Sequence, residues 1–183
     1  MRIIAGKYKK STLNTLQGDD ITRPTRDMVK EALFSSITIH NETVFLDLFS
    51  GSGAIGLEAL SRGCRDVIFN DANRKAYGII KSNLRKFNEE RTVYNDDYAL
   101  CLKKLKGYQF DYVFLDPPYA FREYDSIFQL LEEFGLLKDD GIIIAETRKD
   151  TILADAYGIY GLYKEKKYGI SKLLYYRKKE END

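Results

Sequence analysis

The sequence predicts an α/β fold, in which a Rossmann-like, doubly wound and mostly parallel sheet is closed by a C-terminal antiparallel hairpin. Short apolar runs alternate with amphipathic stretches at helical spacing, which is typical of parallel strands covered by helices on both faces. Two β-rich runs near the C-terminus have no helix between them, which favours an antiparallel pair. The length of 183 residues suits one such domain, preceded by a small basic N-terminal β extension.

The predicted elements follow one another regularly along the chain. Residues 21–25 are predicted to form a loop, because Pro24 fixes φ and disfavours helix at the residue before it. Thr25 is the expected N-cap of a first helix that reaches Ile37. Apolar runs predict strands at 44–49, 67–71, 92–95, 112–116 and 142–146. Helices are predicted at 54–62, 76–87, near 100–105 and near 127–131, and the closing strands at 157–164 and 168–177.

The composition excludes several classes of protein. With 44% hydrophobic and 31% charged residues and only 3 prolines, the chain is neither disordered nor collagen-like. No apolar run approaches the roughly 18 residues of a membrane span, and the N-terminus lacks the apolar core of a secretory signal. Cys64 and Cys101 form no disulfide framework and have no metal-ligand spacing. We therefore expect a cytoplasmic monomer with no membrane contact and no bound metal.

The charge is unevenly distributed although the net charge is only +1. Basic residues outnumber acidic ones at both ends of the chain, whereas the stretch from Tyr108 to Asp155 is acidic. If the two ends lie on one face, they form a surface that attracts phosphates; otherwise they are two solvated surface strands. The predicted RNA-binding residues are Arg2, Lys7, Lys9, Lys10, Arg23, Arg26, Lys166, Lys167 and Lys172.

A glycine-rich segment runs from Asp47 to Gly56, at the end of the first predicted parallel strand. Its glycines fit the dinucleotide fingerprint, and Asp71 ends the next strand, where a ribose-binding acid would lie. A pyrophosphate, however, does not favour a carboxylate at the end of the first strand. S-adenosylmethionine carries an ammonium and a sulfonium, which Asp47 could hold or neutralise. Asp47 therefore favours S-adenosylmethionine as the cofactor over a dinucleotide or a plain glycine turn.

The second motif is Asp116-Pro117-Pro118-Tyr119, whose two prolines directly follow the fourth predicted strand. Adjacent prolines form a rigid turn without amide donors, so that the Asp116 carboxylate and the Pro117 carbonyl both offer acceptors. Such acceptors suit methylation of an exocyclic amine, whose lone pair is conjugated with the ring and must be turned toward the methyl group. Tyr119 could stack on the base and fix its plane.

The positions of these motifs predict that they share one site. In a doubly wound sheet the ligand crevice opens at the carboxyl ends of the strands beside the reversal of strand order. Here these are the first and fourth strands, which lie about 4.8 Å apart if they are neighbours. We therefore expect Asp47 and Asp116 to face one cleft, with the cofactor on one side and the target amine on the other.

With these motifs, the sequence resembles class I S-adenosylmethionine-dependent methyltransferases, and more closely the RsmD family, which methylates a guanine N2 of bacterial 16S ribosomal RNA. The resemblance covers nearly the whole chain, including residues 2–6, 23–34, 47–63, the turn at Asp116 and Tyr168-Gly169. It implies that 27–183 form the methyltransferase domain and that 1–26 form a basic extension that contacts RNA. The implied substrate is 16S rRNA in the small ribosomal subunit or an assembly intermediate.

The resemblance also implies roles for individual residues. The target amine would lie against Asp116, Pro117, Pro118 and Tyr119. The cofactor residues that it implies are Thr25, Asp47, Phe49, Ser50, Gly51, Ser52, Gly53, Asp71, Asn73, Asp97 and Tyr98. Asp71 stands where the family more often has Glu, and either Asp96 or Asp97 could meet the adenine.

Two other interpretations remain open from the residues. The same proline turn serves adenine-N6 DNA methyltransferases and protein-glutamine methyltransferases, although fewer than thirty residues precede the first helix, which is short for a DNA-reading domain. The chain could also be a non-catalytic module that binds a nucleotide or nucleic acid.

Overall fold

The computed structural model describes residues 1–17 and 23–180, in which one eight-stranded sheet has the order β3-β2-β1-β4-β5-β8-β7-β6. The strands are β1 Val44–Asp47, β2 Asp66–Asn70, β3 Val93–Tyr94, β4 Phe110–Leu115, β5 Leu137–Arg148, β6 Ala156–Tyr157, β7 Tyr160–Tyr168 and β8 Ser171–Lys178. The helices are α1 Arg23–Ser35, α2 Ala54–Ser61, α3 Arg74–Lys86, α4 Tyr98–Lys104 and α5 Tyr124–Glu133. β1 to β5 are parallel, whereas β8 joins β5 antiparallel and pairs with β7. The predicted doubly wound sheet and closing hairpin are confirmed.

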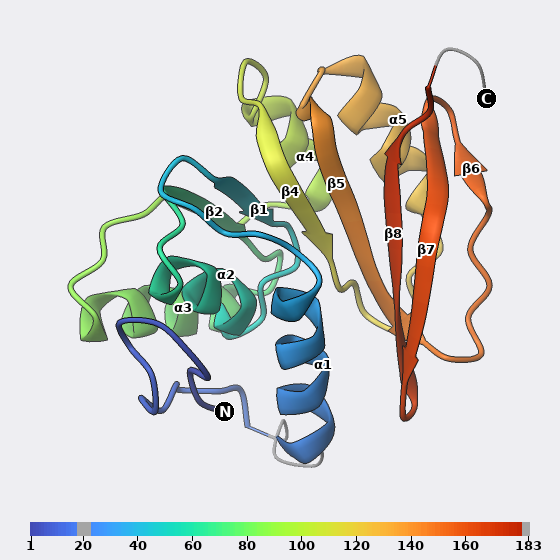
Figure 1. Cartoon of the computed structure of the whole chain (residues 1–183). Coiled ribbons are helices and arrows are strands. Elements are labelled where there is room, and N and C mark those ends of the chain that lie inside the picture. The colour runs from blue at the N-terminus through green and yellow to red at the C-terminus, as the bar shows by residue number, and fades with distance from the viewer. Residues whose placement is uncertain (18–22, 181–183) are drawn as a thin grey trace.

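The helices cover both faces of the sheet, as Figure 1 shows: α1, α2 and α3 lie on one side, and α4 and α5 on the other. Successive residues of the central strands therefore enter different cores. In β4, Phe114 packs with the α1–α3 side, while Val113 packs with the α4–α5 side. Both are buried, which explains why the strands are apolar throughout.

The first helix begins earlier than predicted. α1 starts at Arg23, so the predicted loop over 21–25 is wrong for residues 23–25, and Thr25 lies inside the helix and is not its N-cap. Proline is accepted in a first helical turn, because the amide that it lacks would have no partner there. Residues 21 and 22 and the side chains of Arg23 and Thr25 lie outside the described part of the chain.

Several strand boundaries also differ. β5 starts at Leu137, five residues before the predicted strand, through a polar stretch with an irregular register against β4. The hairpin turn lies at Gly169 and Ile170, so β7 extends to Tyr168. A short additional strand, β6, precedes it. Polar strand ends carry no apolar alternation, which is why the pattern missed them.

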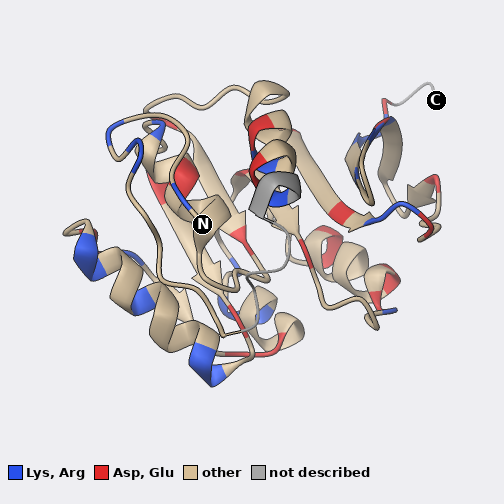
Figure 2. Ribbon diagram, turned by 90° about the horizontal axis from the view of Figure 1, so that it is seen from below, with Lys and Arg blue, Asp and Glu red and all other residues tan. Residues whose placement is uncertain are grey.

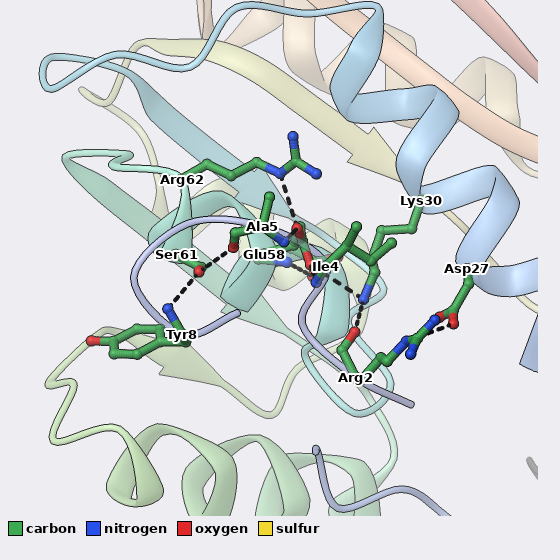
Figure 3. Close-up of polar contacts among 11 residues, drawn as sticks. Arg2, Ile4, Ala5, Tyr8, Asp27, Lys30, Glu58, Ser61 and Arg62 are labelled. Carbon is green, nitrogen blue, oxygen red and sulfur yellow. Dashed lines mark hydrogen bonds and ion pairs between the residues drawn. The ribbon is translucent and has the colours of Figure 1, made fainter. Parts of the chain in front are cut away.

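The predicted N-terminal β extension is present as a short antiparallel hairpin, in which Arg2 forms a bridge with Thr12 and the Ile3 amide donates to the Ser11 carbonyl at 2.9 Å. The backbone of this segment is also held by α2 (Figure 3). The carboxylate of Glu58, which is fully buried, accepts the amides of Ile4 at 2.9 Å and Ala5 at 3.0 Å. The amides that would extend a strand are therefore bonded to a side chain.

Two cationic side chains also lie close to the Glu58 carboxylate. Arg62 Nε lies 2.9 Å and Lys30 Nζ 3.3 Å from its oxygens, and Lys30 donates to the carbonyl of Arg2 as well (Figure 3). A buried carboxylate needs such partners, because desolvation is costly without them. Glu58 therefore joins the N-terminal segment, α1 and α2. The predicted domain boundary at residue 26 falls within α1 and stays a prediction about function.

Gly56 provides a test of how closely α2 packs on the sheet. A Cβ at this position would lie 2.3 Å from Phe69 Cε1 and 2.8 Å from Val67 Cγ1. We expect Gly56→Ala to destabilise the protein by about 1–3 kcal/mol, because the strand below cannot move away. The measurement is the free energy of unfolding from urea titrations.

Gly78 in α3 is the matched control. A Cβ there meets no other atom within 4 Å, so Gly78→Ala should stabilise the helix by up to about 1 kcal/mol. A Gly56→Ala protein as stable as the wild type would contradict the close packing.

Candidate active site

Four acidic residues lie at the carboxyl ends of four neighbouring strands. Asp71 follows β2, Asp47 ends β1, Asp116 follows β4, and Glu146 lies beside Asp116 near the end of β5. All four line one cavity of about 820 Å³. Parallel strands present their carboxyl ends at the same edge of a sheet, where ligands of this fold class bind, and the volume suits a ligand of cofactor size.

Asp47 is the most deeply buried of the four, with 1% of its surface exposed. Its Oδ2 accepts the amide of Gly56 at 3.1 Å, while its Oδ1 has no hydrogen-bond partner among the described residues. Burial, and then the nearby charges of Asp116 and Asp71, raise the pKa of its carboxyl to about 7. Asp47 therefore offers an unsatisfied acceptor to a group that carries hydrogens and positive charge.

The loop after β1 is shaped by hydrogen bonds to the loop after β2. The Gly51 amide donates to Asp71 Oδ2 at 2.8 Å, and the Ser50 amide donates to the Asn70 carbonyl at 2.8 Å. Gly53, the N-cap of α2, has φ of 82°, a left-handed conformation that favours glycine. The chain can therefore turn at once from β1 into α2 and leave the cavity open above Asp47.

Most of the predicted site residues are brought together. Those that line the cavity are Asp47, Phe49, Ser50, Gly51, Ser52, Asp71, Asn73, Asp97, Tyr98, Asp116, Pro117 and Pro118. Gly53 and Tyr119 do not line it, and the side chain of Thr25 lies outside the described residues. Asp96 forms an ion pair with Lys104 at 2.7 Å and does not line the cavity, so Asp97 is the better placed of the two acids.

The chain turns sharply after Asp116. The Phe121 amide donates to the Pro118 carbonyl at 2.8 Å, which closes the turn. Phe121 lines the cavity, and its ring lies 5.4 Å from that of Phe49 and 5.5 Å from that of Tyr98. Tyr119 is instead 60% exposed. The aromatic side chain that the turn brings to the cavity is therefore Phe121, two residues beyond the one that the motif indicated.

Sequence analysis also missed Glu146. Its side chain is half-buried, and desolvation followed by the charge of Asp116 raises the pKa of its carboxyl well above the ordinary value, although Arg26 and a hydrogen bond from Ser171 oppose this. The signal was present, because Glu146 ends the predicted strand 142–146 as Asp116 ends the predicted strand 112–116. Arg26, predicted to contact RNA, also lines the cavity.

Some of the predicted RNA-binding side chains are exposed, and others are exposed but lie close to an acidic side chain. Lys9, Lys10 and Lys166 are exposed. Arg2, Lys7 and Lys167 are also exposed but lie near acids: Arg2 lies 3.3 Å from Asp27, Lys7 2.9 Å from Glu89 and Lys167 3.7 Å from Glu165. Figure 2 shows the molecule from the edge of the sheet at which the parallel strands end. In this view the N-terminal segment and the β7–β8 hairpin lie on either side of α1.

The structure corrects the prediction that Lys172 contributes to an RNA-binding surface. Its side chain is buried and lies 3.7 Å from Glu165, so it is not available to a phosphate in this arrangement. It lies on β8, which is paired on both edges, with β5 and β7. The β pattern of the tail did not show that this lysine faces the protein interior.

Two kinds of feature are not found in the described residues. Within 1–17 and 23–180, no group of three or more His, Cys, Asp or Glu side chains could hold a metal ion. Over the same residues, no helix is long and apolar enough to cross a membrane. Cys64 and Cys101 are buried free thiols.

Comparisons with known proteins agree with this geometry. The family described as Conserved hypothetical protein 95 matches residues 1–177. "Ribosomal RNA small subunit methyltransferase D" of Haemophilus influenzae is 37% identical over 93% of this chain and 90% of its own length. "Putative rRNA methyltransferase YlbH" of Bacillus subtilis is 36% identical over 98% of this chain and all of its own length.

A solved structure is similar over the same extent. The structure named "Putative methyltransferase yhhF", from Escherichia coli, has a TM-score of 0.83 and 30% identity, and 97% of each chain is covered. The observed architecture is that of class I methyltransferases, as predicted. Sequence and structure agree that the chain belongs to the RsmD family, described as Conserved hypothetical protein 95.

Proposed function

We propose that the chain is an S-adenosylmethionine-dependent methyltransferase that modifies the exocyclic N2 amine of a guanine in 16S rRNA, within the small ribosomal subunit or an assembly intermediate. The observation that carries the proposal is the shared cavity of Asp47 and Asp116 on adjacent strands. The names of the relatives support a ribosomal RNA substrate. The guanine N2 position rests on the resemblance and on the acceptors at Asp116.

The residues present fit the proposed cofactor. S-adenosylmethionine supplies an activated methyl group on a sulfonium, together with an ammonium. Asp47 Oδ1, buried and without a described partner, suits these positive charges. Asp71 lies at the carboxyl end of the neighbouring strand, where a ribose is held in folds of this kind. Asp97, Tyr98 and Phe121 would line the adenine end of the cavity.

The other half of the cavity would orient the amine. The Asp116 carboxylate and the Pro117 carbonyl accept the two N–H bonds of the N2 amine, which turns the nitrogen lone pair away from the ring. The turn has no amide donors at Pro117 and Pro118, so it offers acceptors to the amine. A carboxylate beside the amine also stabilises the positive charge that develops on nitrogen as the methyl group arrives, and Asp116 can accept the released proton.

The product of the reaction tests the proposal. Small ribosomal subunits from cells that lack the enzyme are incubated with the protein and isotope-labelled S-adenosylmethionine, and the nucleosides of the digested 16S rRNA are separated by mass spectrometry. We expect the label in N2-methylguanosine. Label in an adenine or in a protein glutamine would support the alternative substrates, and no transfer to RNA would contradict the proposal.

Replacing Asp116 separates orientation of the amine from cofactor binding. We expect Asp116→Ala to reduce turnover by at least about a hundredfold, because the amine loses the acceptor that orients it. Cofactor affinity, measured by calorimetry, should change by less than about threefold, because Asp47 and Asp71 remain in place. Wild-type turnover by the variant would refute the role of Asp116.

Asp47 should make cofactor binding depend on pH. A cationic ligand favours the ionised carboxylate, whose pKa is raised to about 7. The affinity for S-adenosylmethionine should therefore increase as pH rises toward 7, approaching tenfold per pH unit well below it, and should level off above it. Calorimetry over a series of pH values measures this.

Asp47→Asn tests whether the pH dependence comes from Asp47 or from the neighbouring acids, because Asp116, Asp71 and Glu146 remain in this variant. It should bind the cofactor weakly and with little dependence on pH between about 6 and 7. The same pH dependence in wild type and variant would assign the titration to another residue.

The exposed lysines of the N-terminal segment should contribute to RNA affinity. We expect Lys9→Ala combined with Lys10→Ala to weaken binding of small-subunit rRNA and to lower the salt dependence of log Kd by about two. Lys103→Ala with Lys106→Ala on the α4 side is the control, since these exposed lysines lie across the sheet from α1. Equal effects of the two double variants would argue against a localised RNA-binding surface.

A further inference from the structure

Glu146 lies beside Asp116, on the side of the cavity that is further from Asp47. The sheet order places β5 next to β4, and β4 next to β1. Ala145 pairs with Leu115, so the residues that follow them, Glu146 and Asp116, are neighbours where the two strands end. Along this edge of the sheet the acids therefore follow one another as Asp47, Asp116 and Glu146. The acid proposed to meet the cofactor stands at one end of this row and Glu146 at the other.

Glu146 and Asp116 also point to the same face of the sheet. Ile144 and Phe114, two residues before them, both pack in the core on the α1–α3 side. Side chains two residues apart along a strand point to the same face, and both acids line the cavity there. Arg26, on α1, lines the cavity as well, and its charge acts on the Glu146 carboxyl. Figure 1 shows α1 on this side of the sheet.

The proposed reaction leaves Glu146 without a role. Asp116 and the Pro117 carbonyl accept the two hydrogens of the amine, so a further acceptor one strand away can only meet another part of the same base. Desolvation and the charge of Asp116 raise the pKa of the Glu146 carboxyl, while Arg26 and a hydrogen bond from Ser171 lower it. A carboxylate placed in a cavity against this desolvation cost suits a ligand that donates a hydrogen bond to it.

Guanine is the base whose donors match two adjacent carboxylates. Among the four RNA bases, guanine alone has an exocyclic amine next to a ring N–H, which is N1–H. In adenine and cytosine the ring nitrogen beside the amine carries a lone pair, which a carboxylate repels, and uracil has no exocyclic amine. An ionised carboxylate only accepts hydrogen bonds. Two carboxylates on neighbouring strands therefore fit guanine and disfavour adenine and cytosine.

We propose that Glu146 determines the specificity for guanine by accepting the N1–H of the target base while Asp116 holds its amine. This inference rests on the proposed function and adds to it the residue that distinguishes guanine from adenine. The N1–H and the amine lie side by side on the Watson–Crick edge, so a base turned out of the RNA presents both to the same edge of the sheet. The N1–H donor, the cationic cofactor and Arg26 all favour the ionised form of Glu146.

A modified substrate separates the amine from the ring N–H. 2-Aminopurine keeps the amine of guanine but has a lone pair at N1. Small ribosomal subunits are reconstituted with 16S rRNA in which the guanosine that the wild-type protein methylates is replaced by 2-aminopurine, through ligation of RNA fragments. We expect kcat/KM of the wild-type protein for these particles to be at least about a hundredfold below that for guanosine, because the N1 lone pair faces a carboxylate. Labelled S-adenosylmethionine and mass spectrometry of the nucleosides measure the product.

Glu146→Gln should reduce this preference for guanosine to about tenfold or less, because an amide offers its oxygen to N1–H of guanine and its nitrogen to N1 of 2-aminopurine. The affinity of the variant for the cofactor should stay within about threefold of wild type, because Asp47 and Asp71 remain in place. Asp140→Asn is the matched control. Asp140 is exposed on the same strand, does not line the cavity, and should keep the wild-type preference when it is replaced.

The outcomes separate this inference from the proposed function. Equal use of guanosine and 2-aminopurine by the wild-type protein would overturn the role of N1–H, whatever the variant does. An undiminished preference in Glu146→Gln would overturn the role of Glu146, because the missing O6 of 2-aminopurine would then explain the preference. If the wild-type protein methylates no guanosine in unmodified subunits, the proposed function itself is wrong, and this inference with it.

Discussion

A buried carboxylate at the end of a central strand is the constraint on which the rest of this structure depends. Asp47 lies where β1 ends, and one of its oxygens is bonded to the amide of Gly56 in the first turns of α2. This bond requires α2 to lie close to the sheet, which explains the glycine at 56, where a side chain would overlap Phe69. The other oxygen has no described partner, and an unpaired buried acceptor is costly. Natural proteins keep such groups where a ligand completes them.

The acids on the neighbouring strands line the same cavity as Asp47. Asp71, Asp47, Asp116 and Glu146 stand on successive strands. The charges of Asp116 and Asp71 add to desolvation in raising the pKa of Asp47, and the charge of Asp116 adds to desolvation in raising that of Glu146. A cationic donor on one side and a group that develops positive charge on the other would relieve this repulsion. The site is thus electrostatically prepared for transfer of a cationic methyl group. Glu58, on α2 beyond Gly56, holds the N-terminal segment beside this cavity.

The sequence predicted the sheet, its strand order at the switch between β1 and β4, and most of the cavity, because these follow from apolar periodicity and from glycine and proline at strand ends. It did not predict which side chains turn inward. Tyr119 and Phe121 are both aromatic, and only the hydrogen bonds around Pro118 and Arg122 determine which one enters the cavity. Lys172 faces the interior and Arg26 the cavity for the same reason: local pattern does not specify orientation. The N-terminal β extension is present but short, because Glu58, distant in the sequence, accepts the amides of Ile4 and Ala5.

The most direct test of the central claim is a crystal structure of the protein with S-adenosylhomocysteine. The account predicts that the ammonium group of this ligand contacts Asp47 Oδ1 and that its sulfur faces Asp116 across the cavity. A ligand whose adenine lies against Asp47, or whose sulfur is turned away from Asp116, would contradict it.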